Sequence, residues 1–137
     1  MEQQLSIIAR EVAYSDMDFA LRANPITGDI ARKKDVEAIK QSVLNILLTN
    51  RGERPFQPTF GSDITGQLFE NFDPIVAALI EEKVRFALIN FEPRIKVLNV
   101  RVEDRSDRNS IGVTVEIEIV SPERVTTEID FTVERLR

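Results

Sequence analysis

Glu92, Pro93 and Arg94 place a carboxylate, a proline and a guanidinium in a row, directly after the longest apolar-periodic stretch of the chain. Arg94 offers a planar set of N–H donors that suits carboxylates or the carbonyls at the end of a helix. Glu92 can orient Arg94, and its carboxylate can accept hydrogen bonds from the N-terminus of a helix. The tripeptide is a chemically unusual end for a helix, directly before a predicted strand. One interpretation is an ion pair that only ties down its own corner, against Arg51 or Glu53.

The absence of His and Cys from the 137 residues removes much catalytic chemistry. No His general base, thiolate nucleophile, disulfide or Cys/His zinc site can form. There is no glycine-rich phosphate loop, and Asp16-Met17-Asp18 lacks the other ligands of a calcium loop. The remaining option is a carboxyl pair such as Glu70 and Glu92, because glycoside hydrolysis needs two carboxyls about 5–10 Å apart, one with a raised pKa. Arg94 would lower the pKa of Glu92, so we predict no enzymatic activity, no metal and no cofactor.

A second charged set lies on the last two predicted strands and contains only acids. Apolar residues occupy odd positions there, so the even positions share the other face, which carries Glu116, Glu118, Glu128, Asp130 and Glu134. Matching the apolar faces predicts Glu116 opposite Glu128 or Asp130, where like charges destabilise a sheet. Two interpretations stay open: a solvated face partly compensated by Arg101, or a face that binds a basic partner.

The last predicted strand, Val125–Val133, is also an edge strand in a simple meander, and it contains no proline. Such an edge can accept a strand from another chain. Its charges can equally serve to prevent that pairing, and the sequence does not decide between the two.

The central element that positions these residues is a helix over Asp73–Glu92, with Asp73 as N-cap and Pro74 at the first helical position. Proline disfavours helical backbone angles at the residue before it, so Pro93 should end the helix at Glu92. Apolar residues recur at helical spacing, and further ones widen the stripe: Val76, Leu79, Ile80, Val84, Phe86, Ala87, Leu88 and Phe91. So broad an apolar arc predicts a helix covered from more than one side.

A first helix is predicted over Asp35–Asn50, with Asp35 as N-cap and Gly52 as the left-handed residue that closes it. Residues 51–72 are irregular but apolar, and we expect them to pack against the protein rather than extend into solvent. Ser62 or Asp63 is expected to cap a short helix running to Glu70.

Three strands follow, over Ile95–Glu103, Ile111–Ile119 and Val125–Val133, and Leu98, Val100 and Val102 should share one face of the first. The fold class is α+β: two main helices plus a short one packed on one face of a three- to four-stranded antiparallel meander. We expect residues 1–34 to form a partly extended N-terminal arm, with short strands around 18–22 and 29–32, and residues 35–137 to form a single domain.

The order of motifs supports a family resemblance. RGxRPFxPxFGSDI from Arg51, LFEN from Leu68 and EPRI from Glu92 precede the strand meander. This order resembles the baseplate wedge family of contractile phage tails, which is related to the small baseplate component of type VI secretion systems. The resemblance covers roughly Asp35–Val133.

The resemblance implies a structural role: a wedge subunit, six copies around the tail axis, that initiates the tail sheath by exchanging strands with it. It implies other wedge proteins, the sheath protein and the tail tube as partners, and a location in the virion tail baseplate after assembly in the host cytoplasm. The wedge interface would comprise Arg51, Arg54, Glu92, Pro93 and Arg94. The sheath interface would be the acidic face, Glu116, Glu118, Glu128, Asp130 and Glu134.

Other classes of function fit less well. Some members of that family carry a lysozyme-type label, which leaves a cell-wall glycan hydrolase as the alternative, although the residues do not support it. The net charge of −5 argues against nucleic acid as a partner. The longest purely apolar run, Ile75–Ile80, is far too short to span a membrane.

Overall fold

The computed structural model describes residues 14–18, 20–29, 32–69, 71–105, 107, 109–120 and 124–134. The chain divides into two compact units, Met1–Ala38 and Ile39–Arg137, and each is described by itself. The division into an arm of residues 1–34 and a domain of residues 35–137 stays a prediction.

The first unit contains a two-stranded antiparallel sheet of β1 (Ser15–Met17) and β2 (Arg32–Lys34). The strands therefore differ in position from those expected around 18–22 and 29–32: β1 ends before residue 18, and β2 begins only at residue 32. Asp18 explains part of the difference, because its carboxylate accepts hydrogen bonds from Ala20 N–H (3.2 Å) and Arg22 Nε (3.1 Å). Such local bonds favour a turn over a strand.

The second unit is organised around α2 (Pro74–Phe91), which begins and ends where the sequence predicts. Asp73 has extended backbone angles, and its Oδ1 accepts from the N–H groups of Ile75 and Val76, both at 2.8 Å. At the other end, Glu92 N–H donates to Leu88 O at 2.9 Å, directly before Pro93. Both helix ends are thus satisfied by the residues that the sequence indicated.

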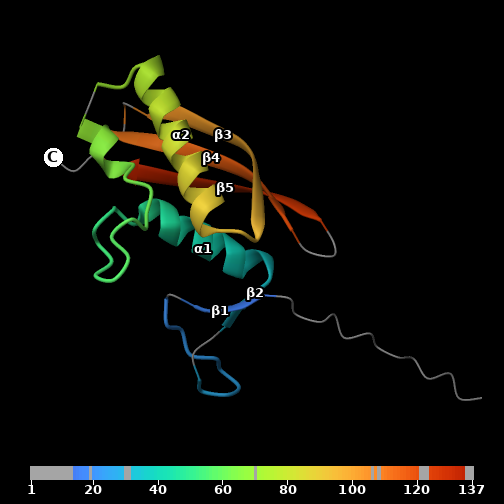
Figure 1. Ribbon diagram of the computed structural model, residues 1–137. Coiled ribbons are helices and arrows are strands. Elements are labelled where there is room, and N and C mark those ends of the chain that lie inside the picture. Colours follow the sequence, from blue (N-terminus) through green and yellow to red (C-terminus); the bar gives the residue numbers. More distant parts are fainter. Residues whose placement is uncertain are drawn as a thin grey trace, which may run out of the picture. The chain divides into compact units, whose positions relative to one another are not determined.

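Helix α2 lies against one face of the sheet (Figure 1). Its buried residues lie on one side of the helix and are Val76, Ile80, Val84, Ala87 and Leu88. Leu79 and Phe86, which we expected to be covered from a second side, are exposed together with Ile75 and Ile89. That expectation is wrong, because no second layer packs on this side among the described residues of the second unit.

Helix α1 (Val36–Leu48) buries Ala38, Ile39, Val43, Ile46 and Leu47. Asp35 differs from a regular N-cap: its φ is 49°, and its Oδ1 accepts from Tyr14 N–H at 3.3 Å. Gly52 is left-handed as predicted, with φ 86°, but it lies in the turn after the helix, where its N–H donates to Pro58 O at 2.9 Å.

The loop after α1 is packed only in its second half. Ser62 donates from Oγ to Leu47 O (2.6 Å) and from its N–H to Thr49 O (3.1 Å), so it closes the end of α1 instead of capping the short helix. That short helix is η1 (Thr65–Phe69), a 3-10 turn. Residues 51–59 are all exposed, contrary to expectation. Their own turn hydrogen bonds, such as Gln57 N–H to Arg54 O, satisfy the backbone without packing.

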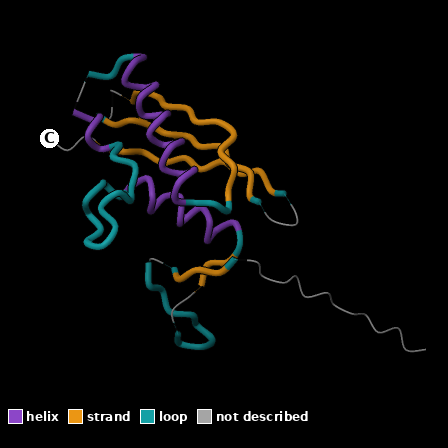
Figure 2. The backbone as a smooth tube through the Cα atoms, in the orientation of Figure 1, coloured by secondary structure: helices purple, strands orange, loops and turns teal. Residues whose placement is uncertain are grey.

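The sheet is the predicted antiparallel meander, β3 (Ile95–Arg105), β4 (Ser110–Ile119) and β5 (Val125–Glu134), in the order β3-β4-β5. Figure 2 shows the three strands beside one another, with α2 crossing one face. A register shift between Val97 and Asn99 adds one residue to β3. This bulge exposes Leu98, so it does not share the inner face with Val100 and Val102 as expected.

Candidate functional site

The corner between α2 and β3 is built around the buried carboxylate of Glu92, whose side chain is 2% exposed. Arg94 donates hydrogen bonds to both carboxylate oxygens, from Nε to Oε1 and from Nη2 to Oε2, each at 2.6 Å. Ser42, in the middle of α1, donates from Oγ to Oε2, also at 2.6 Å. The middle of α1, the end of α2 and the residue that leads into β3 therefore meet at one carboxylate, and the Arg94 side chain remains 29% exposed.

Burial alone would raise the pKa of Glu92, but the hydrogen bonds from Arg94 and Ser42 and the charge of Arg94 outweigh it, so the pKa lies below its usual value. Glu92 is therefore held as a carboxylate. The corner is tied by Ser42 and Arg94, not by Arg51 or Glu53. Ser42 was missed in the sequence, although it lies next to the apolar stripe of α1, where a hydroxyl needs a partner.

Arg54 is linked to this corner through two aromatic rings. Its guanidinium lies 4.1 Å from the centre of the Phe60 ring, and Phe60 packs on Phe91 with ring centres 5.0 Å apart. Phe91 directly precedes Glu92 in the chain. The structure thus places Arg54 near the end of α2, a juxtaposition that sequence distance alone does not reveal.

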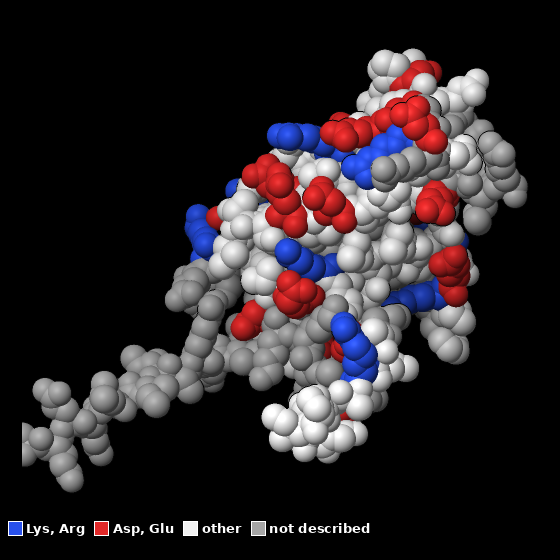
Figure 3. All heavy atoms as spheres, turned by 180° about the vertical axis from the view of Figure 1, so that it is seen from behind, with Lys and Arg blue, Asp and Glu red and all other residues white. Residues whose placement is uncertain are grey.

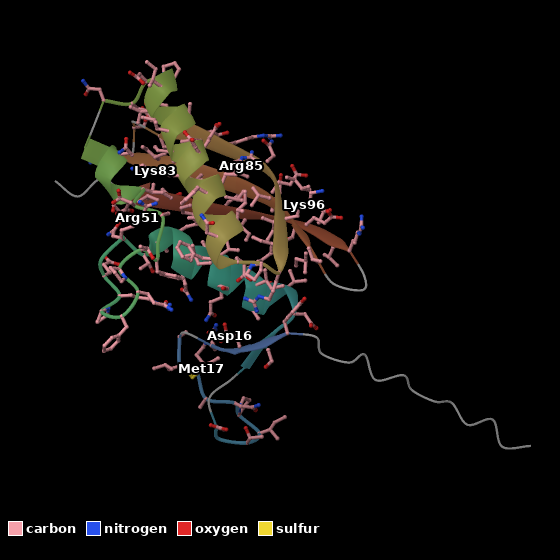
Figure 4. All side chains as sticks on the ribbon, in the orientation of Figure 1. Asp16, Met17, Arg51, Lys83, Arg85 and Lys96 are labelled. Carbon is pink, nitrogen blue, oxygen red and sulfur yellow. The ribbon has the colours of Figure 1, made fainter. Side chains whose placement is uncertain are left out.

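Arg51 and Phe56 lie on the exposed loop. Figure 4 shows Arg51 where the loop leaves α1. Phe56, which we had expected to be packed, is 97% exposed at the loop's far side. An exposed aromatic ring between two prolines, Pro55 and Pro58, is a rigid apolar group of the kind that anchors protein interfaces. The motif that contains Arg54 also contains this anchor.

The acidic set lies on the sheet face that α2 does not cover, and Figure 3 shows this side of the molecule. Glu116 pairs directly with Glu128, as predicted, while Asp130 lies opposite Thr114 and Glu134 opposite Ser110. Basic residues on β3 reduce the repulsion between these carboxylates. Lys96 lies opposite Glu118, and Arg101 lies opposite Thr114, next to Glu116. Glu128, Asp130 and Glu134 are exposed, and Glu116 and Glu118 are half-buried.

Arg105 links all three strands across the same face. A Cβ atom added to Gly112 of β4 would lie 2.7 Å from Arg105 Nε, so the guanidinium of this β3 residue passes directly over the glycine. Its Nη1 then donates to Thr132 Oγ1 on β5 at 3.0 Å. The missing side chain at Gly112 thus allows one arginine to brace the edge strand.

Over the described residues, no group of three or more acidic, His or Cys side chains is arranged to hold a metal ion. None of the described helices has the length and hydropathy needed to cross a membrane.

Comparison with known proteins identifies the family. Residues 33–133 match the family described as baseplate wedge protein gp25. The chain belongs to this family. It is 36% identical over 107 residues to the baseplate wedge protein gp25 of Enterobacteria phage T4. The aligned region covers 78% of this chain and 80% of the T4 protein. The resemblance inferred from the motifs is confirmed, and with it a structural role in a contractile-tail baseplate.

Solved structures show the same fold. A Geobacter sulfurreducens protein named as a candidate tail lysozyme has 30% identity and a TM-score of 0.67, covering 72% of this wedge protein and 89% of the other chain. A chain of the anti-feeding prophage baseplate, solved with 6-fold symmetry, has 23% identity and a TM-score of 0.70 over 79% and 86%. A chain of the type VI secretion baseplate complex has 19% identity and a TM-score of 0.55 over 69% and 89%. At these last two identities only the fold is compared.

Proposed function

We propose that this wedge protein templates the first ring of tail sheath by offering the edge of β5 to a strand of the sheath protein. The observation that carries the proposal is the sheet order. β5 is a ten-residue edge strand, and among the described residues its outer side pairs with no other strand. An unpaired row of backbone donors and acceptors is a template for a strand from another chain.

The acidic face indicates which charge the sheath strand should carry. Three of its exposed carboxylates, Glu128, Asp130 and Glu134, lie on β5 itself. The incoming strand would therefore carry basic residues on the same face, where opposite charges across a strand pair are favourable.

The corner at the end of α2 would dock the subunit on other wedge proteins. Arg94 is partly exposed and Arg54 and Arg51 lie on the adjoining loop, whereas Glu92 is buried and acts as the residue that positions Arg94. Pro93 fixes the backbone between them. Six copies around the tail axis, with the tail tube as a further contact, would make weak single contacts sufficient. Such a subunit would assemble in the host cytoplasm and remain in the virion baseplate.

The test is charge reversal on the template strand in cells that assemble the complete tail. Glu128→Lys/Asp130→Lys should leave incorporation into the baseplate intact but give baseplates without extended sheath in electron micrographs. Glu103→Lys, on the same face of the opposite edge strand, is the matched control and should assemble normally. Sheath of normal frequency on the double variant would refute the template.

We further propose that the chain acts without catalysis. The glycan-hydrolase alternative needs a carboxyl with a raised pKa, but the pKa of Glu92 is lowered and both its oxygens accept hydrogen bonds from its own chain. Its suggested partner, Glu70, lies outside the described residues. Purified protein should release no reducing sugar from cell-wall glycan, and hydrolysis that Glu92→Gln abolishes would overturn this view.

A further inference from the structure

We propose that the outer side of α2 is a separate docking surface that binds an amphipathic α-helix of another protein, with a basic residue of that helix opposite Glu82. The surface, here called the α2 stripe, consists of Ile75, Leu79, Glu82, Phe86 and Ile89. It lies on the opposite side of the sheet from the acidic face, so the inference does not depend on strand templating.

The five positions follow helical spacing, at steps of four, three, four and three residues, and therefore form one straight row. At 1.5 Å per residue the row is about 21 Å long, or four turns of a helix. The four apolar members are exposed, Ile75 at 70% and Phe86 at 56% among them. Exposed apolar residues aligned on one side of a helix indicate an interaction site, whereas scattered ones do not, and here two apolar pairs flank the central Glu82.

The helix does not need these residues for its own fold. Its opposite side already fills the core with Val76, Ile80, Val84, Ala87 and Leu88, and Figure 1 shows that side against the sheet. Helix α2 therefore carries two sets of apolar residues at helical spacing, one buried and one exposed. The exposed set has no internal partner within the described part of residues 39–137.

Glu82 lies at the centre of the row, and its charge indicates which occupant fits. Among the described residues no ion pair joins Glu82. Its neighbour Lys83 instead reaches Asp63, with Nζ 3.3 Å from the carbonyl oxygen and 3.5 Å from Oδ2. Figure 4 shows Lys83 and Arg85 on different sides of α2. A partner that covers the row must therefore meet a carboxylate in a desolvated setting, which favours a Lys or Arg on the partner.

A second copy of this chain would not satisfy that requirement. Two antiparallel copies would place Ile75 against Ile89 and bring the two Glu82 carboxylates together at the two-fold axis, where like charges repel. A membrane surface also fits poorly, because Glu82 would enter the apolar layer and the net charge of −5 opposes anionic lipid. A helix of a different protein remains as the occupant that suits the shape and charge of the row.

The main test places a photo-crosslinking phenylalanine at position 86 of the full chain in cells that assemble the complete tail. The cross-linked peptide should come from a different protein, show apolar residues at helical spacing and carry Lys or Arg within one turn of the cross-link. The same group at Asp107, an exposed residue between β3 and β4 that belongs to none of the proposed surfaces, is the control. Glu82→Lys should reduce the cross-link yield about tenfold, and reversal of the partner's basic residue should restore it.

Three outcomes would overturn the inference: a cross-link to this chain itself, a cross-linked segment without helical apolar spacing, or a yield no higher than at Asp107. Because residues 82 and 86 are exposed, the Glu82→Lys and Phe86→Glu variants should melt within about 2 °C of the wild type, which separates docking from folding.

The isolated protein gives a second test of the occupant. The wild type should not self-associate through the row, whereas Glu82→Leu, which removes the central repulsion, should dimerise in light-scattering measurements. Dimers of the wild type that Phe86→Glu dissociates would assign the row to a second copy. Binding to phosphatidylglycerol vesicles that Phe86→Glu abolishes would assign it to a membrane. Either result would refute the helix partner.

Discussion

At the residue scale, Glu92 is buried while Arg94, the residue that it holds, reaches the surface at the end of α2. The carboxylate accepts from three donors on Arg94, its Nε, Nη2 and backbone N–H, and from one on Ser42, so it satisfies its charge within its own chain. This changes how the motif is tested. Arg94→Ala would leave a buried carboxylate without its cation, which costs roughly 3–5 kcal/mol. Loss of assembly in that variant would therefore not by itself prove docking.

Glu92→Gln should lower the free energy of unfolding by roughly 1.5–3 kcal/mol at pH 7. The folded-state pKa of Glu92 lies below the unfolded value of 4.5. Its contribution is therefore complete above pH 4.5 and is lost as the pH falls through the folded-state pKa. Urea unfolding followed by circular dichroism should show the gap between wild type and variant closing below pH 4.5. A gap that does not change with pH would contradict the charged pair.

Two glycines should respond very differently to the same substitution. In Gly61→Ala the new Cβ would overlap Thr49 O, and the φ of 115° is strained for any residue other than glycine. The variant should therefore lose more than about 2 kcal/mol of unfolding free energy. In Gly112→Ala the Cβ meets only the flexible end of Arg105, so the loss should stay within roughly 1 kcal/mol. Chemical denaturation of both variants measures the contrast, and equal losses would show that Arg105 is fixed as rigidly as backbone.

At the element scale, the sequence predicts α2 and the meander well because their signals are local. Asp73, Pro74 and Pro93 mark the helix ends, and strict alternation marks β4 and β5. The same alternation predicted Glu116 opposite Glu128 or Asp130, and the structure pairs it with Glu128. The misses have non-local causes. Ser42 meets Glu92 across 50 residues of chain, and the second apolar period of α2 was assigned to a covering layer that the described residues do not provide.

The bulge in β3 separates Leu98 from the core. Ile95 and Val97 precede it with odd numbers, and Val100 and Val102 follow with even ones, so one residue must be skipped to keep all four on the same face of the sheet. Leu98→Ala should therefore cost no more than about 1 kcal/mol, whereas Ile117→Ala, at a fully buried site on β4, should cost about 2–5 kcal/mol. Thermal or urea unfolding of the two variants measures both losses of stability. A loss at position 98 as large as that at position 117 would contradict the bulge and indicate a regular strand with Leu98 in the core.

At the scale of the whole molecule, three separate surfaces are arranged around one small core. The edge and acidic face of β5 lie on one side of the sheet, the α2 stripe lies on the other, and the Arg94 corner joins them at the end of α2. A subunit of this kind can hold helices on one side while it offers a strand on the other. Contacts that are weak singly become stable when several are made at once in a ring.

The pair of Glu116 and Glu128 gives this arrangement a measurable consequence. In the isolated protein Glu128→Lys replaces repulsion across the strands with attraction, so it should raise stability by a few tenths of a kcal/mol, an increase that 1 M salt should remove. In the tail, the same change should reduce the number of baseplates that start a sheath, because the template has lost a charge for its basic partner. Glu103→Lys, at the opposite edge, is the control. A variant that is more stable and still starts sheath normally would show that the acidic face is only solvated and takes no part in templating.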